Sequence, residues 1–503
     1  MGDPYYITTA ISYPNGPPHI GHAYEAIAAD AMARFQRSRG RDVRFQTGTD
    51  EHGLKMAQAA RGEGVEPRAF ADKMSRLFQD MCDTLNVSYD RFIRTSEEDH
   101  YRASQAIWKA MEERGDLYLD RYEGWYSVRD EAYYEEDELV GGDDGARLSP
   151  QGTPVEWTVE KSWFFRLSKY QQPLLDLYAT NPEFIRPESR RNEVVRFVEG
   201  GLKDLSISRT SFDWGVPVPG SDNHVMYVWL DALTNYITGL GYPDDTGLWR
   251  KYWPADVHLI GKDVVRFHAV YWPAFLMSAG IELPRQVYGH GFLLSRGEKM
   301  SKSVGNVVDP MVLADRFGVD ALRYFLLREV TFGQDGSYSA EAIVARANAE
   351  LANSFGNLAQ RTLSMVYKNL DGVLPVAGDA QEDRELLDLV TSVTIGDMAE
   401  QFDRLGFSFG IEAWMKAVFA CNSYVDAQAP WTLRKTDPDR MAAVLGTLVV
   451  AVRQLARAIA PIIPASASKL LEAIDAGADG APIAQPVPLF PRLELPEEED
   501  VPA

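Results

Sequence analysis

The apolar pattern of the N-terminal segment changes from a strand to a helix and back to a strand. Residues 5–11 are rich in β-branched and aromatic side chains, which indicates a buried strand. After a segment rich in proline and glycine, residues 21–39 have the alanine content of a helix, which Gly40 ends. Residues 43–47 form a second predicted strand. A strand, a helix and a strand over about 45 residues predict a βαβ unit and therefore a parallel sheet.

A different pattern runs from residue 116 to residue 223. Short aromatic stretches of alternating polarity, at 125–128 and 132–135, precede a loop at 141–147. Such alternation is typical of half-buried strands. We therefore expect a separate insertion built on small sheets.

The α/β pattern resumes after this insertion. Residues 224–230 and 257–260 are predicted strands, and residues 264–279 are a predicted helix. Residues 286–294 lead into a loop flanked by glycines. The insertion is thus expected to split one α/β domain.

Helical spacing dominates after about residue 338. Ser339 is a plausible N-cap. Apolar residues follow it at helical intervals: Ile343, Ala347, Leu351, Phe355, Leu358 and Val366. Further helices are predicted around 414–425 and 445–459, which together indicate a C-terminal helical bundle. The acidic, proline-bearing tail at 496–503 is expected to be disordered.

Composition narrows the class of protein. The chain has 503 residues, of which 45% are hydrophobic and 25% charged, so it can bury a large core in two to four domains. The net charge of -22 argues against a protein that coats nucleic acid by charge alone. Any RNA partner must be held by local basic patches and by shape, and the acidity itself is explained by solubility.

The cysteines and the N-terminus favour a cytoplasmic protein. Cys82 and Cys421 are too few for a disulfide framework or a four-cysteine zinc site, and they fit a reducing compartment. No signal peptide is visible, and Tyr6 stands where a myristoylation motif has serine or threonine. The apolar run at 442–452 ends at Arg453 and is too short to span a bilayer. We expect no membrane partner.

The first chemical motif is Pro18-His19-Ile20-Gly21-His22, between the first strand and its helix. Free backbone N–H groups and the helix dipole favour anions at such a place. Glycine lets a ligand approach the backbone closely, and two imidazoles three residues apart can both hydrogen-bond phosphate oxygens. Taken alone, a His-x-x-His pattern is a weak signal and more often has a structural or metal-binding role.

The second motif reads Gly-Glu-Lys-Met-Ser-Lys-Ser at residues 297–303. Lys299 and Lys302 flank a hydroxyl-rich turn after a predicted strand, and Gly305 follows. A mobile loop of this kind can close over a triphosphate and stabilise charge on leaving pyrophosphate. The alternative is an ordinary solvated basic loop.

In this order, the two motifs together resemble the paired signatures of class I aminoacyl-tRNA synthetases. The resemblance implies that catalysis rests on His19, His22, Lys299 and Lys302. It also implies that ATP, with its Mg²⁺ held mainly by ATP oxygens, is bound by Gly21, His22, Lys299, Met300, Ser301 and Lys302.

Further segments are similar to those of methionyl-tRNA synthetases in particular. They are Ala-Ile-Ser-Tyr-Pro-Asn-Gly at 10–16, Tyr-Val-Trp-Leu-Asp-Ala at 227–232 and Gly-Lys-Asp-Val-Val-Arg-Phe-His at 261–268. That family implies an α/β, Rossmann-like parallel-sheet catalytic domain split by a connective insertion and followed by an α-helical anticodon-binding bundle. The corresponding boundaries are 1–115 and 224–300 for the catalytic domain, 116–223 for the insertion, 301–350 for the loop and stem-contact region, 351–495 for the bundle and 496–503 for the tail.

The same resemblance implies a methionine site. Its residues would be Ala10, Ile11, Tyr13, Asp50, Trp229, Leu233, Tyr236, Val264 and His268, with Asp50 on the substrate ammonium. A polarizable thioether is favoured against aromatic edges, which Tyr13, Trp229 and Tyr236 can supply. Without the resemblance, each aromatic is more simply a core residue and Asp50 a turn or cap residue. Some relatives carry proline where Leu233 stands.

The insertion departs from the pattern of many relatives, which carry zinc-binding C-x2-C pairs there. Ser127 and Asp130 stand where cysteines would be. We therefore expect no protein-bound zinc and no metal site, and we expect aromatic packing by Trp125, Tyr126, Tyr133 and Tyr134 to hold this region together.

The predicted bundle carries candidates for anticodon recognition. Asn353, Asn357 and Arg361 share one polar helix face, and Trp431 follows a proline that discourages the preceding helix from continuing. The family reads the anticodon with an Asn, an Arg and a Trp in such settings, which matches Asn357, Arg361 and Trp431. A solvated face and core packing of Trp431 are the alternatives.

Two other classes remain open. A small-molecule adenylyltransferase of the same superfamily could share both signatures, although such enzymes are usually shorter and lack the bundle. A non-catalytic tRNA-binding relative would be expected to have lost signature residues. Isoleucyl, valyl and leucyl enzymes normally carry a longer editing insertion. The expected partners are L-methionine, ATP and both initiator and elongator tRNA(Met), and a monomer is favoured.

Overall fold

The computed structural model describes residues 2–130, 132–142, 145–295, 298–299 and 307–495. The chain divides into two compact units. The first comprises the described parts of Met1–Pro18, Arg39–Asp83 and Ser88–His290, and the second those of His19–Ser38, Thr84–Val87 and Gly291–Ala503.

A parallel sheet forms the centre of the first unit. Its strands are β1 (Pro4–Thr9), β2 (Asp42–Thr49), β3 (Arg91–Arg94), β9 (Ile185–Arg186), β13 (Val257–Gly261) and β14 (Val287–His290). They lie in the order β3-β2-β1-β13-β14-β9, and every neighbouring pair is parallel. Since β1 and β2 are joined through α1 (Ile20–Ser38), the predicted βαβ unit and parallel sheet are confirmed.

One or more helices lie between each of the later pairs of these strands along the chain. They are α2 (Leu54–Glu63), α3 (Pro67–Thr84), α4 (Glu98–Glu113), α5 (Gln171–Thr180), α6 (Glu188–Glu199), α7 (Val228–Thr238), α8 (Gly247–Tyr252) and α9 (Trp272–Ala279). The helix predicted at 264–279 is present in outline. A π-helical turn, η5 (Phe267–Tyr271), precedes α9 within it.

Helix α7 shows that the strand predicted at 224–230 was wrong over most of its length. Only Val225–Met226 (β12) is extended, and α7 begins at Val228. Every residue of α7 except Trp229 is buried. A helix without a polar face has no amphipathic period, so its apolar run could not be distinguished from a buried strand.

The region predicted as an insertion contains an antiparallel sheet in the order β10-β8-β4-β5. Its strands are β4 (Leu117–Ser127), β5 (Ala132–Tyr134), β8 (Glu156–Phe165) and β10 (Leu205–Ser206). Two smaller sheets pair β6 (Val140–Gly141) with β7 (Arg147–Leu148), and β11 (Ser208–Arg209) with β12. Helices α5 and α6 also lie in this range, which the aromatic pattern did not predict, and β9 joins the central sheet.

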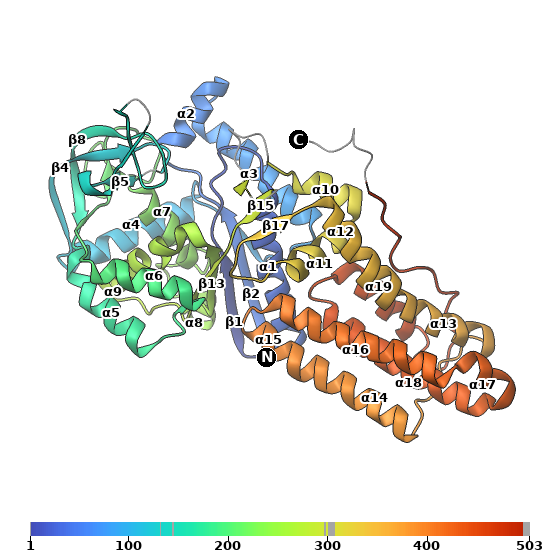
Figure 1. Cartoon of the computed structure of the whole chain (residues 1–503). Helices are drawn as coiled ribbons and strands as arrows, with labels where there is room; N and C mark the ends of the chain where they lie inside the picture. The colour runs from blue at the N-terminus through green and yellow to red at the C-terminus, as the bar shows by residue number, and fades with distance from the viewer. Residues whose placement is uncertain (1, 131, 143–144, 296–297, 300–306, 496–503) are drawn as a thin grey trace. The chain divides into compact units, whose positions relative to one another are not determined.

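The second unit is mainly helical. Its later helices are α10 (Pro310–Phe317), α11 (Val319–Glu329), α12 (Ala340–Arg346), α13 (Asn357–Asn369), α14 (Gln381–Thr391), α15 (Met398–Asp403), α16 (Phe407–Gln428), α17 (Pro430–Thr436), α18 (Pro438–Ile459) and α19 (Pro464–Asp475). A small sheet, β16-β15-β17, is formed by β15 (Leu293–Ser295), β16 (Glu298–Lys299) and β17 (Gly336–Tyr338). Helices α13, α14 and α16 each contact α18 and form the predicted bundle, coloured from yellow to red in Figure 1.

Two local features refine the prediction for this bundle. The hydroxyl of Ser339 accepts from the backbone N–H of Ala342 at 3.1 Å, which confirms the predicted N-cap. A π-helical segment, η6 (Ala347–Gly356), separates α12 from α13 and shifts the helical register between them. Among the described residues, α18 alone has the length and composition of a membrane span, and 61% of that stretch is buried, as in a core helix.

A buried guanidinium ties α1 into the second unit. Arg323 on α11 is fully buried and donates to a carboxylate oxygen of Asp30 on α1 at 2.6 Å. It also donates to the carbonyl oxygens of Leu85 at 3.1 Å and Ile462 at 2.9 Å. One side chain thereby satisfies groups from three separate segments, which fixes α1 against α11 and the start of α19.

Candidate functional site

Three loops with predicted methionine-binding residues leave the same edge of the parallel sheet. Strands β1, β2 and β13 are adjacent and parallel, so their carboxyl ends lie together. Residues 10–13 follow β1, Asp50 follows β2 and Val264 follows β13. The backbone N–H of Asp50 donates to the carbonyl oxygen of Ser12 at 2.8 Å. The sheet thus brings these three parts of the predicted site together.

Helix α7 supplies a further group of predicted residues. Trp229, Leu233 and Tyr236 are spaced so that they share one face of the helix. Leu233 and Tyr236 are buried, whereas Trp229 is partly exposed. The indole of Trp229 stacks on the ring of Phe267, with centroids 3.7 Å apart and planes at 4°. The exposed member of the group is therefore held in one orientation.

Tyr236 and His268 form a buried hydrogen-bonded pair. Nδ1 of His268 lies 2.9 Å from the carbonyl oxygen of Val264, which can only accept, so Nδ1 carries the proton. In the neutral ring, Nε2 then accepts from the hydroxyl of Tyr236 at 2.6 Å. Burial lowers the pKa of His268 to about 4, although the hydrogen bond to Val264 acts in the opposite direction. The ring is neutral at physiological pH and suits an uncharged thioether.

Tyr13 is fixed by the start of α2. Its hydroxyl accepts from the backbone N–H of Met56 at 3.2 Å, and the ammonium of Lys55 lies 5.2 Å from its ring centroid. Asp50 is buried beside the same segment. A buried carboxylate at the edge of a sheet is a suitable partner for a substrate ammonium.

The first of the two signature motifs lies at the N-terminus of α1. The rings of His19 and His22 are 3.8 Å apart between centroids, and both residues are half-buried. Nδ1 of His22 accepts from the backbone N–H of His19, and Nδ1 of His19 accepts from that of Gly21, both at 3.1 Å. A Cβ at Gly21 would lie 2.9 Å from the His19 ring, so any other residue at this position would displace the imidazole. The two rings lie in contact, tilted by 31° to one another, at the positive end of a helix.

The second motif is described in part. Lys299 ends β16, whose partner β15 pairs Leu294 with it and also contacts α1. Met300, Ser301 and Lys302 lie outside the described residues. Beyond them, the carbonyl oxygen of Val308 accepts from the backbone N–H of Ile20 at 3.0 Å. Before the lysine motif, β15 contacts α1, and after it Val308 is bonded to Ile20, the first residue of α1. All of these segments belong to one compact unit.

The anticodon candidates lie together in the bundle. The guanidinium carbon of Arg361 is 5.6 Å from the ring centroid of Trp431, and Arg361 also donates to Asp426 at 3.3 Å. Asn357 is exposed, and Trp431 is 49% exposed, which argues against core packing of this indole. Pro430 does more than end a helix, because it starts the short helix α17 that carries Trp431.

The insertion is stabilised by more than aromatic packing. The expected contacts are present: Tyr126 lies 4.8 Å from Tyr133 between ring centroids. In addition, a carboxylate oxygen of Asp130 accepts from the hydroxyls of Ser149 and Thr153, both at 2.6 Å. Asp130 and its two partners form a compact polar cluster that the sequence pattern did not reveal.

Ser127 and Asp130, which stand where many relatives carry cysteines, are thus part of one hydrogen-bond network. The hydroxyl of Ser127 is 2.6 Å from that of Thr153, and it accepts from the backbone N–H of Asp130 at 3.2 Å. Among the residues that the structure describes, no group of three or more His, Cys, Asp or Glu side chains is placed to hold a metal ion.

The sequence did not reveal a buried carboxylate, that of Asp231, next to the predicted methionine-binding residues of α7. Asp231 lies on α7 between Trp229 and Leu233, and its carboxylate is 2.6 Å from Nδ1 of His52 and 2.7 Å from Nε2 of His100. The sequence offered one sign of this network: His52 stands two residues after Asp50, in the segment that follows β2.

Comparison with known proteins agrees with this arrangement. Residues 5–363 match the family model described as "tRNA synthetases class I (M)", and residues 374–487 match the "Anticodon binding domain of methionyl tRNA ligase". The chain is 57% identical to the methionine–tRNA ligase of Brucella suis over 511 aligned positions, which cover 99% of each chain. It is 55% identical to the methionine–tRNA ligase of Mycobacterium tuberculosis H37Rv, with 98% of this chain and 99% of that protein covered.

Solved structures give the same result. The structure of Mycobacterium tuberculosis methionyl-tRNA synthetase in complex with methionyl-adenylate matches with a TM-score of 0.94 at 55% identity, covering 97% of this chain and 100% of that one. The ligand-free structure of the M. tuberculosis enzyme matches with a TM-score of 0.88, covering 99% of each chain. The chain therefore belongs to the methionyl-tRNA synthetase family of class I aminoacyl-tRNA synthetases.

Proposed function

We propose that this chain activates L-methionine with ATP to form methionyl-adenylate, and then transfers the methionyl group to the 3′-terminal adenosine of initiator and elongator tRNA(Met). The M. tuberculosis relative, which is 55% identical over nearly the whole chain, was solved with methionyl-adenylate. That ligand is the product of the first of these two steps.

The observation that carries the proposal is that the predicted methionine-binding residues lie together at one edge of the sheet. Ala10, Ile11, Tyr13, Asp50 and Val264 lie on three adjacent loops, and α7 adds Trp229, Leu233 and Tyr236, the last bonded to His268. The aromatic rings and the neutral imidazole offer a polarizable surface to the thioether. The carboxylate of Asp50 offers an opposite charge to the ammonium. Leucine at 233, where some relatives carry proline, keeps this surface apolar.

In the first step, a carboxylate oxygen of methionine attacks the α-phosphorus of ATP. The bond from that phosphorus to the bridging oxygen breaks, and pyrophosphate leaves with the electron pair. No enzyme nucleophile takes part, so the protein acts by positioning and by stabilising charge. We assign charge stabilisation to His19, His22, Lys299 and Lys302, with Gly21, Met300 and Ser301 completing the ATP contacts. Mg²⁺ enters with ATP and is held mainly by the phosphate oxygens.

In the second step, the 2′-hydroxyl of the terminal adenosine attacks the carbonyl carbon of the adenylate, and AMP leaves. Asn357, Arg361 and Trp431 select the tRNA at its anticodon. The exposed indole of Trp431 can stack on an unpaired base, and Arg361 beside it can pair with a phosphate or a base edge.

The proposal extends to the organisation and setting of the chain. The catalytic domain is assigned to 1–115 and 224–300, the insertion to 116–223, the stem-contact region to 301–350 and the bundle to 351–495. The chain acts as a cytoplasmic monomer. Its methionine site rejects homocysteine weakly, because one methyl group is worth about 1–3 kcal/mol, and we expect removal of activated homocysteine by cyclisation at the same site.

The direct test is charging of tRNA(Met) with labelled methionine in the presence of MgATP. The expected result is one AMP and one pyrophosphate for each methionyl-tRNA formed. Methionyl-adenylate formation without any transfer to tRNA would contradict the proposal and would favour a small-molecule adenylyltransferase. Absence of both steps in folded protein would favour a non-catalytic relative.

A further inference from the structure

The loop that carries Asp50 is anchored on one side by a buried ion pair. Glu51 is fully buried, and its carboxylate accepts from Nε of Arg94 at 2.7 Å and from the terminal nitrogen of the same guanidinium at 3.0 Å. The hydroxyl of Ser96 donates to it as well, at 2.5 Å. The residue directly after Asp50 therefore has no freedom to rotate away from the sheet edge.

On the other side, the loop is anchored to α7. Nδ1 of His52 donates to one carboxylate oxygen of Asp231 at 2.6 Å, and Nε2 of His100 donates to the other at 2.7 Å. Nε2 of His52 lies 3.0 Å from the hydroxyl of Tyr101. All the polar atoms of the His52 ring and of the Asp231 carboxylate are thus committed to one another or to α4.

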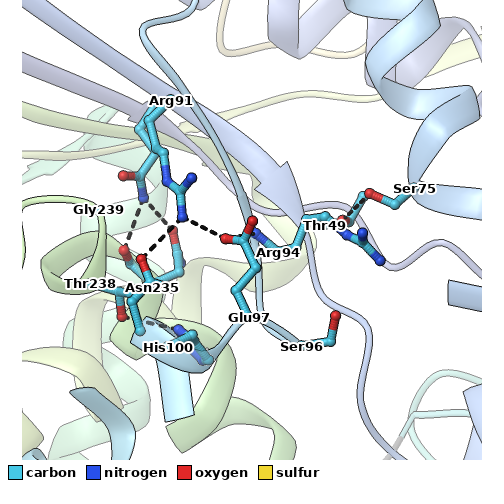
Figure 2. Close-up of polar contacts among 12 residues, drawn as sticks. Thr49, Ser75, Arg91, Arg94, Ser96, Glu97, His100, Asn235, Thr238 and Gly239 are labelled. Carbon is cyan, nitrogen blue, oxygen red and sulfur yellow. Dashed lines mark hydrogen bonds and ion pairs between the residues drawn. The ribbon is translucent and has the colours of Figure 1, made fainter. Parts of the chain in front are cut away.

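The second imidazole extends this network along α7. Nδ1 of His100 lies 3.0 Å from the hydroxyl of Thr238, at the end of that helix. Figure 2 shows His100 next to Thr238, and shows Arg94 next to Thr49 at the end of β2. Asp231 is consequently the point at which α7, α4 and the Asp50 loop meet.

Trp214 packs against the loop that carries Asp50 and hydrogen-bonds to its backbone. Its indole N–H donates to the carbonyl oxygen of Glu51 at 2.5 Å, and its carbonyl oxygen accepts from the backbone N–H of Gly53 at 3.1 Å. The indole also packs edge-on against His52, with centroids 5.3 Å apart. The peptide groups on both sides of His52 are therefore held together with its side chain.

Asp231 is suited to an electrostatic role in this network. The residue is fully buried, and burial raises the pKa of its carboxyl. The charges and hydrogen bonds of His52 and His100 outweigh burial and hold the pKa at about 2. The carboxylate is ionised throughout the physiological range. A buried anion with two directional partners fixes geometry more strictly than apolar packing does.

We propose that Asp231 is a positioning residue for methionine binding: through His52, it sets the distance between the ammonium-binding carboxylate of Asp50 and the side-chain-binding face of α7. The inference rests on the proposed role of Asp50. Its geometric basis is that Asp231 lies on the same helix as Trp229 and Leu233, whereas His52 lies two residues from Asp50.

Asp116 provides a matched control. It is a fully buried carboxylate in the same compact unit, and it accepts from Lys169 at 2.6 Å, Tyr170 at 2.5 Å and Ser278 at 2.7 Å. None of these partners lies on α7 or on the Asp50 loop. Asp116→Asn therefore reproduces the loss of a buried, hydrogen-bonded charge without touching the proposed connection.

The test measures methionine-dependent ATP–pyrophosphate exchange in Asp231→Asn, His52→Ala, His52→Asn, Asp50→Asn and Asp116→Asn. We expect Asp231→Asn and His52→Ala to raise KM for methionine on the order of 10-fold, as loss of a charged hydrogen bond does, with KM for ATP unchanged. His52→Asn keeps an N–H at the Nδ1 position and should recover most of the loss. Asp116→Asn should lower Tm and leave KM for methionine unchanged.

A double-mutant cycle distinguishes this role from a merely structural one. If Asp231 acts through Asp50, Asp231→Asn should raise KM for methionine by less than about 3-fold in the Asp50→Asn background. A normal KM for methionine in Asp231→Asn and His52→Ala, with Asp50→Asn impaired, would overturn this inference alone. A normal KM in Asp50→Asn would overturn the proposed role of Asp50 and this inference with it. If Asp231→Asn does not fold, KM for methionine in His52→Ala and His52→Asn tests the inference instead.

Discussion

The backbone N–H of Ile20 donates to the carbonyl oxygen of Val308 at 3.0 Å. Ile20 lies between the two imidazoles of the first signature, and Val308 follows the lysine signature shortly along the chain. The two motifs are about 280 residues apart in sequence, yet this bond ties the first to the chain segment that follows the second. A common role on one set of phosphates requires such proximity.

Lys299→Ala should slow methionyl-adenylate formation on the order of 100-fold or more, because a charge stabiliser is lost from the leaving pyrophosphate. The measurement is ATP–pyrophosphate exchange at saturating methionine. Lys368→Ala, which removes an exposed lysine from α13, serves as the control and should exchange normally. Normal exchange in Lys299→Ala would remove this lysine from the mechanism.

Trp431→Ala should lower the rate of tRNA charging on the order of 10- to 100-fold, because base–aromatic stacking contributes about 1–3 kcal/mol. Pyrophosphate exchange should stay within about twofold of the original, since methionine and ATP do not contact the bundle in the proposed mechanism. Phe419 on α16 is 53% exposed, close to the 49% of Trp431, so Phe419→Ala is a matched control. Equal damage to both steps would instead indicate that the indole stabilises the bundle.

The stability of the chain should fall as the pH decreases from 6.5 toward 4. Burial lowers the pKa of His268 to about 4 and that of His258 well below its usual value. In this window the unfolded imidazoles bind protons that the folded ones do not, so unfolding becomes more favourable. Above pH 6.5 these rings are neutral in both states, and the stability they contribute is complete.

Chemical denaturation at a series of pH values measures this dependence. His268→Gln should reduce the slope by up to about 1.4 kcal/mol per pH unit, the contribution of one proton. Tyr236→Phe leaves the imidazole buried and should retain the slope. An unchanged slope in His268→Gln would mean that this ring titrates normally in the folded protein.

The insertion should hold together without zinc. Metal analysis of the purified protein is expected to find far less than one zinc per chain, and chelation should leave Tm unchanged. Asp130→Ala should destabilise the insertion by about 1–3 kcal/mol, because hydroxyl groups lose their acceptor, whereas Asp137→Ala at an exposed position should not. Protection of the insertion against limited proteolysis reports the difference. Stoichiometric zinc would contradict this account.

The parallel sheet and the helical bundle could be predicted because their patterns are local. β-branched runs bounded by glycine and proline gave the strands, and helical spacing after Ser339 gave the bundle. The strand predicted at 224–230 was wrong because α7 is buried all around and shows no polar face. The boundary between α12 and α13 was hidden for another reason, since a π-helical turn leaves no distinct residue pattern.

The predicted site residues came from motifs, whereas their supports depend on long-range contacts. Asp231 is 179 residues from His52 and 131 from His100 in sequence, so no local spacing could reveal their network. The same holds for the cluster around Asp130, whose partners Ser149 and Thr153 are ordinary loop residues in the sequence. Motifs in the sequence therefore identified the side chains proposed to contact substrate, but not the buried side chains that hold them in place.

ATP–pyrophosphate exchange measured with each of the twenty standard amino acids tests most directly whether this chain selects methionine for activation. Methionine should stimulate exchange far above the level reached with any other amino acid, and Asp50→Asn should weaken that stimulation by raising KM. Exchange that does not respond to methionine, or that responds equally to another amino acid, would contradict the account.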